Sequence, residues 1–274
     1  MGRIPGKELE TMLRGVPFYV QVYVKDCQTD EVFSYHAEEQ ISAASTIKVP
    51  LLALLLKDAQ DGRINMDVPR TFPDSNRAGG SGLLIDLSRT FRPTLRDLAL
   101  LMITVSDNAA TNELIDTVGM ERFNRFWKEW GCSQTVLMRK MSDQAAIRRG
   151  LNNYTSAADA GKILCAVAKG EMFDRSVSGQ VFEVMRKQKL RNRLPLLIPA
   201  ADAYGPDGDV PVGTVLVANK TGSLPGQSHD IGIFELPGHR RYVMAVYTKG
   251  STSGGEASLL IARLSETVYN GMRQ

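Results

Sequence analysis

The chain has 274 residues, of which 43% are hydrophobic and 23% charged, and its formal net charge is +3. This is the composition of an ordinary globular protein with enough apolar residues for a large core. The small charge argues against a nucleic-acid-binding protein, which would be much more basic, and no apolar run is long enough to span a bilayer. The length predicts one large domain or two lobes that fold as a unit.

The three cysteines, Cys27, Cys132 and Cys165, lie far apart in the sequence and form no CxxC pair. An odd number without that spacing argues against a disulfide framework and against a zinc site. Buried free thiols are favoured, and a single bridge stays open. The first residues, MGRIPGKELETML, lack the apolar segment of a signal peptide, so we expect a chain that is not exported or one whose signal was removed.

The N-terminal part predicts two strands followed by a helix. Residues 15–26, GVPFYVQVYVKD, alternate and are rich in Val, Tyr and Phe, which is typical of a strand. Residues 27–40 continue as a turn and a second strand. The run QISAASTIKVPLLALLLKD at 40–58 is apolar over more residues than a strand needs, and it predicts a helix.

The middle of the sequence predicts a block of helices. Within residues 93–119 one helix begins with Thr94 as its cap and Asp97 in its first turn, and a second runs from about Ala109 to Gly119. Two further helices, each ended by glycine, are expected at 120–131 and 155–170. The basic stretch at 186–193, RKQKLRNR, alternates with apolar residues and predicts a solvated helix face.

The last third predicts three strands, at 213–223, 230–238 and 240–250, and then an amphipathic helix at 255–272. Two strands, a helical block, three strands and a helix predict an α+β fold, an α/β sandwich plus an all-helical lobe. Its antiparallel sheet is built from both chain ends and flanked by helices. A cleft between the two lobes is the expected site.

We therefore expect a single domain over residues 1–274. Its α/β lobe covers approximately 1–48 and 205–274, and its helical lobe approximately 49–204.

Several common chemistries lack their sequence signals. The histidines are isolated and there is no HExxH, so no metal site is expected. No serine lies in a GxSxG turn, and no GxxxxGK[ST] or GxGxxG segment is present, so neither a nucleophile elbow nor a phosphate or dinucleotide site is expected. The sequence predicts no cofactor.

The pair Ser45 and Lys48 stands out in the apolar 40–58 segment. A spacing of three places both side chains on one helical face. Serine is a weak nucleophile without an adjacent base, and a lysine kept neutral by burial and by a nearby cation can act as that base. Because serines and lysines are common, this pair alone is a weak signal.

Two more motifs strengthen the interpretation. VSDNAATN places Ser106, Asp107 and Asn108 between two predicted helices, and VANKTGS places Lys220, Thr221, Gly222 and Ser223 at the end of a predicted strand. In this order, S-x-x-K, S-D-N and K-T-G form the signature of the penicillin-recognising serine enzymes.

On these motifs the chain resembles the class A β-lactamase-like serine hydrolases from about residue 15 to the C-terminus. The resemblance implies an antiparallel sheet flanked by helices, with an all-helical lobe across the cleft. It also implies that Ser45 is acylated by a substrate carbonyl, that Lys48 is the candidate base, and that Ser106 relays a proton to the leaving nitrogen. Lys220 would supply positive charge near Ser106.

The resemblance also implies substrate-binding roles. Asn108 would hold the substrate's side-chain amide and help to position Lys48. Thr221, Gly222 and Ser223 would bind the substrate, with Lys220 and Thr221 meeting its carboxylate. The backbone N–H groups of Ser45 and Ser223 would form the oxyanion hole, and Asp107 would hold the loop.

The resemblance breaks where the acyl-enzyme must be hydrolysed. Class A β-lactamases use a glutamate on a long loop for this step, but this chain has no glutamate between Glu129 and Glu171, and the interval looks shorter. Its only acids are Asp143 and Asp159. For Asp143 a role as helix N-cap is favoured over a role as base, and Asp159 falls inside a predicted helix. Asn152 and Asn153 could hold a water but cannot take its proton, so we expect acylation to be retained and deacylation to be slow.

Three hypotheses follow: a β-lactamase-like hydrolase, a penicillin-binding peptidase or esterase with slow deacylation, and a catalytically retired ligand-binding member. The complete set of motif residues argues against the third. The expected partner is a small β-lactam or a peptide- or ester-like molecule, with no nucleic acid and no membrane segment, and the sequence leaves the oligomeric state open. The family is bacterial and works outside the cytoplasm, so an extracytoplasmic location is implied if a signal was removed, and a cytoplasmic one otherwise.

Overall fold

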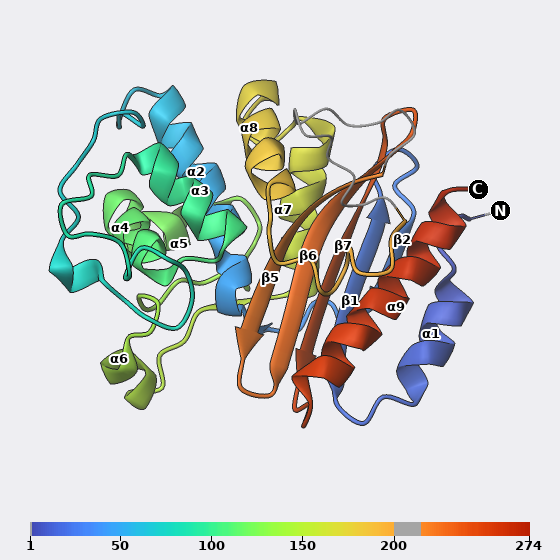
Figure 1. Cartoon of the computed structure of the whole chain (residues 1–274). Coiled ribbons are helices and arrows are strands. Elements are labelled where there is room, and N and C mark those ends of the chain that lie inside the picture. Colours follow the sequence, from blue (N-terminus) through green and yellow to red (C-terminus); the bar gives the residue numbers. More distant parts are fainter. Residues whose placement is uncertain (1, 200–214) are drawn as a thin grey trace.

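The computed structural model describes residues 2–199 and 215–274. Its main sheet has five antiparallel strands in the order β2-β1-β7-β6-β5, so strands from both chain ends lie side by side (Figure 1). The strands are β1 (Tyr19–Asp26), β2 (Val32–Tyr35), β5 (Leu216–Leu224), β6 (Gln227–Leu236) and β7 (Arg240–Lys249). The expected α+β fold with a sheet built from both ends is confirmed.

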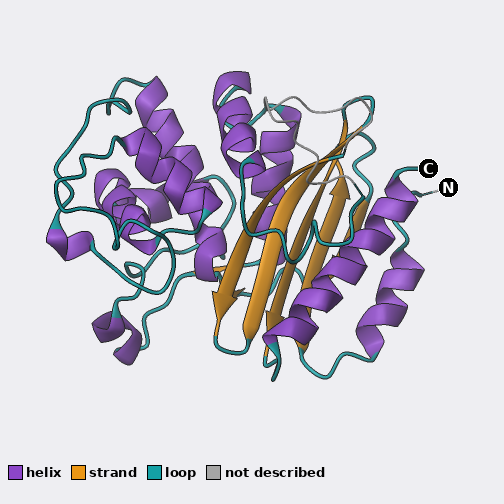
Figure 2. Cartoon of the chain, in the orientation of Figure 1, coloured by secondary structure: helices purple, strands orange, loops and turns teal. Residues whose placement is uncertain are grey.

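Two helices cover one face of the sheet, α1 (Gly6–Arg14) and α9 (Gly254–Met272) (Figure 2). Ser253 caps α9 by accepting a hydrogen bond from the N–H of Glu256. The sequence interpretation did not include α1, because its segment buries only Leu9 and Leu13 and gains that burial through packing in the same core as α9.

The other face of the sheet is covered by α7 (Ala157–Lys169), with α8 (Arg175–Arg186) beside it (Figure 1). Close packing of α7 on β1 depends on Gly161, because a Cβ there would lie 2.1 Å from Cδ1 of Tyr23. The apolar residues of this layer belong to one buried cluster that continues into the helical part of the molecule.

The remaining helices form the second part of the molecule (Figure 2). They are α2 (Lys48–Gln60), α3 (Leu95–Thr104), α4 (Asn108–Val118), α5 (Met120–Glu129) and the short α6 (Gln144–Arg148), with 3-10 turns η1 (Ala44–Ile47) and η2 (Asp74–Asn76). The expected cap at Thr94 is present as a capping box with Asp97. A small second sheet pairs β3 (Ile41–Ser42) with β4 (Tyr154–Thr155) and ties the start of η1 to the loop before α7.

The division into an α/β lobe (1–48 and 205–274) and a helical lobe (49–204) stays a prediction. Two expected positions lie outside the described residues: the lobe limit at 204/205 and the start, at 213, of the first C-terminal strand. No helix in the described ranges is long and apolar enough to cross a membrane.

Candidate active site

Ser45 lies in η1, which runs directly into α2, and its side chain faces a cavity of about 160 Å³. The residue before it, Ala44, has a φ of 45°, in the left-handed region that non-glycine residues rarely adopt. Such a conformation costs about 1–3 kcal/mol and persists where the surrounding structure holds it. Within residues 2–199 and 215–274 the Ser45 hydroxyl has no hydrogen-bond partner, so it is available to a ligand.

Strand β5 packs closely against η1 at Gly222. A Cβ on this glycine would lie 3.2 Å from both the Cβ of Ala44 and the Cγ2 of Thr46. This contact places the K-T-G segment, at the edge of the sheet, beside Ser45. Glycine suits this position because any larger residue would press on η1.

Lys48 is completely buried, and its amine contacts the S-D-N segment. Its Nζ donates to the backbone oxygen of Ser106 at 2.8 Å and to Oδ1 of Asn108 at 2.9 Å, and it lies 3.1 Å from Oγ of Ser106. Burial holds the pKa of Lys48 well below its usual value, and the nearby Lys220 cation lowers it further. The structure therefore favours a neutral amine, as a general base requires.

Lys220 approaches Ser106 from the other side. Its Nζ donates to Oγ of Ser106 at 3.0 Å and to the backbone oxygen of Thr221 at 2.8 Å. Burial lowers the pKa of Lys220 to about 7, while the carboxylate of Asp230 opposes that shift. We call Lys48, Ser106 and Lys220 the amine cluster.

The hydroxyl of Ser106 lies between the two amines of this cluster. A hydroxyl donates one hydrogen bond and accepts others. With Lys48 neutral and Lys220 charged, Ser106 can accept from Lys220 and donate to the lone pair of Lys48. Ser106 itself has a φ of 57°, a second strained position at the site.

The S-D-N segment also holds the loop in front of the cavity. Asp107 caps α4 through the N–H of Ala110 and accepts hydrogen bonds from the N–H groups of Leu83 and Leu84, both at 2.7 Å. Asn108 donates from Nδ2 to the backbone oxygen of Gly79 at 3.0 Å. The amide of Asn108 thus joins the Lys48 amine to the loop edge.

Arg193 is a site residue that sequence reasoning missed. The interpretation of 186–193 as a solvated helix face is wrong, because α8 ends at Arg186 and Arg193 is buried. Its guanidinium donates to the backbone oxygens of Gly222 and His229 and to Oγ of Ser223, all at 2.6 Å. No local pattern distinguishes this arginine from its basic neighbours, since the contacts are made with distant strands.

A buried carboxylate holds the Arg193 segment against β5. Asp230 accepts from the N–H of Leu194 at 3.0 Å and from Nδ2 of Asn219 at 3.0 Å. Burial raises the pKa of Asp230 to about 6. Arg193 and Lys220 together make the K-T-G side of the cavity electropositive.

The opposite side of the cavity is formed by residues 139–153, which we call the loop wall. The cavity is lined by Ala44, Ser45, Asn108, Arg139, Met141, Ser142, Gln144, Ile147, Asn153, Ser223 and Leu224. None of these lining residues, within the described part of the chain, carries a carboxyl group.

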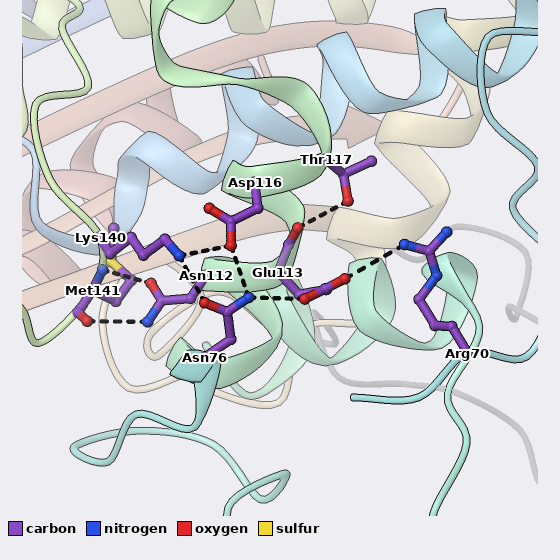
Figure 3. Close-up of polar contacts among 8 residues, drawn as sticks. All are labelled: Arg70, Asn76, Asn112, Glu113, Asp116, Thr117, Lys140 and Met141. Atoms are coloured by element: carbon purple, nitrogen blue, oxygen red, sulfur yellow. Dashed lines mark hydrogen bonds and ion pairs between the residues drawn. The ribbon is translucent and has the colours of Figure 1, made fainter. Parts of the chain in front are cut away.

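Met141 is held in the loop wall by α4 (Figure 3). Its N–H donates to Oδ1 of Asn112 at 2.7 Å, and its backbone oxygen accepts from Nδ2 of the same side chain at 3.2 Å. The preceding Lys140 donates to Asp116 at 2.6 Å and to Asn76 at 2.8 Å. Two anchored residues in succession fix the backbone that presents Met141, a residue that sequence reasoning did not single out.

The other loop residues considered from sequence are used by the protein itself. Asn153 lines the cavity, but its Oδ1 accepts from the N–H groups of Met138 and Arg139. Asn152 donates to Oγ of Ser42 at 2.8 Å and lines an adjoining cavity of about 550 Å³. Asp143 caps α6, as expected, and Asp159 accepts from the N–H of Gln134 and from Thr135.

The residues described include no group of three or more His, Cys, Asp or Glu side chains placed to hold a metal ion. The site consists of a hydroxyl in a cavity, two buried amines joined by a second hydroxyl, and a guanidinium.

Comparison with known proteins shows that the chain is similar to beta-lactamases. The model of the beta-lactamase enzyme family matches residues 5–272. The beta-lactamase CARB-4 of Pseudomonas aeruginosa is 30% identical over 128 residues, which are 44% of this chain and 42% of that protein. The matched region therefore spans less than half of that relative's length.

Two solved structures share the fold. A beta-lactamase from Sphaerobacter thermophilus has a TM-score of 0.87 at 24% identity, covering 98% of this chain and 97% of that one. PBP-A has a TM-score of 0.83 at 25% identity, with 97% and 95% coverage. A leucine-to-glutamate variant of PBP-A has been solved as an acyl-enzyme complex with penicillin G.

Proposed function

The chain belongs to the beta-lactamase enzyme family, and on that premise we propose that it is a serine hydrolase acylated at Ser45 by β-lactams or related amides and esters, with slow release of the acyl group. One observation carries the proposal. Lys48 begins α2 directly after the turn that carries Ser45 and is joined to Lys220 through Ser106, while no carboxyl group lines the cavity in the described part of the chain.

In the proposed acylation, the Ser45 hydroxyl attacks the substrate carbonyl and gives its proton to the neutral amine of Lys48. The low pKa of Lys48 supports this role, since a base must be unprotonated at the working pH. The proton then passes through the Ser106 hydroxyl, 3.1 Å from Nζ of Lys48, to the leaving nitrogen. The outcome is an ester between Ser45 and the substrate acyl group.

The developing oxyanion would be stabilised by the backbone N–H groups of Ser45 and Ser223. Ser45 is in the first turn of η1, where N–H groups have no partner within the helix. Ser223 is on β5, which within residues 2–199 and 215–274 is an edge strand paired with β6 alone, so its outward N–H groups meet no other strand there. Donors of this kind typically contribute about 10²–10³ in rate.

A substrate carboxylate would bind at the electropositive side of the cavity. Lys220 and Arg193 supply the charge, and Thr221, Gly222 and Ser223 supply the polar surface of β5. The 2.6 Å contact from Arg193 orients the Ser223 hydroxyl, and Asn108 remains the candidate contact for the substrate's side-chain amide. Penicillins and cephalosporins carry a carboxylate on the carbon next to the lactam nitrogen, which suits this arrangement.

Deacylation is the step for which this site is least equipped. It requires a base that activates water, and loss of such a base typically costs about 10²–10⁴ in rate. In this chain the loop wall presents the thioether of Met141 and the amide of Asn153, and neither can take a proton from water. The acyl-enzyme of the PBP-A variant supports the view that this fold can hold a penicillin-derived adduct.

A chromogenic cephalosporin separates this function from that of an efficient β-lactamase. We expect a burst of product equal to the enzyme concentration, followed by slow turnover, and neither phase in Ser45→Ala. Fast, steady turnover that depends on Ser45 would favour the efficient β-lactamase. No reaction with a β-lactam or an activated ester would leave the ligand-binding hypothesis.

A further inference from the structure

Cys27 and Cys165 belong to one buried cluster, and the proposed reaction uses neither of them. Cys27 directly follows β1, and Cys165 is in the third turn of α7. Both side chains are buried, at 8% and 7% exposure, and both belong to the buried cluster between the sheet and α7. The two thiols are close enough for each to shift the pKa of the other.

Several independent contacts hold these two positions next to each other. The N–H of Cys27 donates to the backbone oxygen of Arg241 at 3.0 Å, and the guanidinium of Arg241 donates to the backbone oxygen of Ala168 at 2.9 Å. One turn of helix separates Ala168 from Cys165. The end of β1 is therefore fixed against the last turns of α7.

A second set of contacts surrounds the pair with charge. Lys25 on β1 and Lys169 at the end of α7 both pair with Oδ1 of Asp30, each at 2.9 Å. These three residues bridge the strand and the helix over the two sulfurs. Cys132 is elsewhere, with its Sγ directed to the backbone oxygen of Asp159.

We propose that Cys27 and Cys165 form an intramolecular disulfide site that joins β1 to α7 when the protein meets a small peroxide oxidant. Nothing in the proposed acylation uses either thiol, so this site is independent of the function proposed for Ser45.

The reaction balances with hydrogen peroxide as the oxidant. The Cys165 thiolate attacks one peroxide oxygen, so that a sulfenic acid forms and hydroxide leaves. The Cys27 sulfur then attacks the Cys165 sulfur, the S–S bond forms, and the Cys27 proton leaves with the hydroxyl group as water. The hydroxide takes up the proton that Cys165 released on forming its thiolate, so two thiols are oxidised by two electrons and one peroxide is reduced to two molecules of water.

The local charges assign the roles of the two cysteines. The hydrogen bond from Cys27, helped by Lys25 and Lys169, lowers the pKa of Cys165 to about 7 against the effect of burial. The pKa of Cys27 is raised by its hydrogen bond to Cys165 and by burial. Burial raises the pKa of Cys132 to about 12, so that thiol is a matched unreactive control.

The test is peroxide treatment of the folded full-length protein at pH 8, followed by alkylation of the remaining thiols and mass spectrometry. Wild type should lose two of its three alkylatable thiols and yield a Cys27–Cys165 cross-linked peptide that a phosphine reductant separates. Cys132→Ser should give the same cross-link. In Cys27→Ser the oxidised Cys165 has no partner, so a sulfenic acid should accumulate there and be trapped by dimedone.

Oxidised wild type should also unfold at a Tm higher by roughly 5–10 °C, because the bridge closes a long loop in the unfolded chain. Three alkylatable thiols after a treatment that oxidises free glutathione completely would overturn the proposal. A cross-link that includes Cys132, dimedone labelling at Cys132, or a Tm below that of the reduced protein would overturn it too. Near-UV circular dichroism of each variant before oxidation checks that it is folded.

Discussion

The two sides of the Ser45 cavity are built from different chemistry. On one side the amine cluster places titratable groups within hydrogen-bond distance of one another, and burial lowers the pKa values of both lysines. The Lys220 cation lowers the pKa of Lys48 further, and the Arg193 guanidinium adds to the lowering at Lys220. On the other side the loop wall uses its polar groups on its own backbone and presents an apolar Met141. Under the proposed mechanism, such a site can take a proton from serine and lacks a base that takes one from water.

In the proposed mechanism, this difference divides the reaction into a fast acylation and a slow deacylation. Acylation and deacylation take place at the same carbonyl carbon and use the same oxyanion hole, so they differ mainly in the base that activates each nucleophile. Substitutions on one side of the cavity should therefore change one half-reaction and leave the other unchanged.

The largest effect is expected on the amine cluster. Lys48→Met keeps the length and apolar body of the side chain but removes the base, so acylation by penicillin G should slow by about 10²–10⁴. Stopped-flow or quenched acylation kinetics measure this. Lys57→Met, on the same helix but in a partly exposed pair with Asp61, is the matched control and should acylate normally. Near-normal acylation of Lys48→Met would mean that Lys48 is only structural.

A substitution in the loop wall is expected to speed deacylation instead of slowing acylation. Met141→Glu puts a carboxylate into the cavity from a backbone fixed by Asn112, so hydrolysis of the acyl-enzyme should accelerate by about 10². The decay of a preformed adduct measures this rate. Met141→Gln has the same shape without a base and should leave the lifetime unchanged. Equal lifetimes for the two variants would show that residue 141 does not reach the water.

A smaller effect is expected where the substrate carboxylate binds. Arg193→Lys keeps a charge but loses the planar group that contacts Gly222, His229 and Ser223, and the second-order acylation constant should fall about tenfold, or about 1.4 kcal/mol. A penicillin methyl ester, which lacks the carboxylate, should react equally with both proteins. An equal loss with the ester would assign Arg193 to holding β5 instead.

The smallest effect concerns pH. Lys220 has its pKa lowered to about 7, so its charge is present below that pH and lost above it, and the second-order acylation constant should fall about fivefold between pH 6 and pH 8. Lys48 must be neutral to act as the base. The second-order acylation constant should therefore also fall at low pH, where Lys48 becomes protonated. Lys220→Arg stays charged and should remove the alkaline limb. A wild-type profile that rises steadily through pH 8 would contradict this role.

The fold and the motif residues could be predicted because their signals are local. Strand alternation, glycine stops and caps such as Thr94 are read from neighbouring residues, and each of the three motifs spans three or four positions. Their assembly follows from the antiparallel sheet, which brings Lys220 from one end of the chain to Ser45 and Ser106.

Arg193 and Met141 could not be predicted because their roles depend on distant partners. Arg193 looks like any basic residue until its segment is fixed on β5 by Asp230. Met141 enters the cavity because Asn112, on α4, holds its backbone from 29 residues away. Helix α1 was missed for a related reason, since its two buried leucines reach a core built largely from the other end of the chain.

The most direct test of the contrast between the two sides is intact-mass spectrometry over time after one equivalent of penicillin G is added to wild type. The account predicts a covalent adduct at Ser45 that forms quickly and persists long after free penicillin is consumed. Complete hydrolysis of many further equivalents at the rate of acylation, with no adduct accumulating, would contradict it.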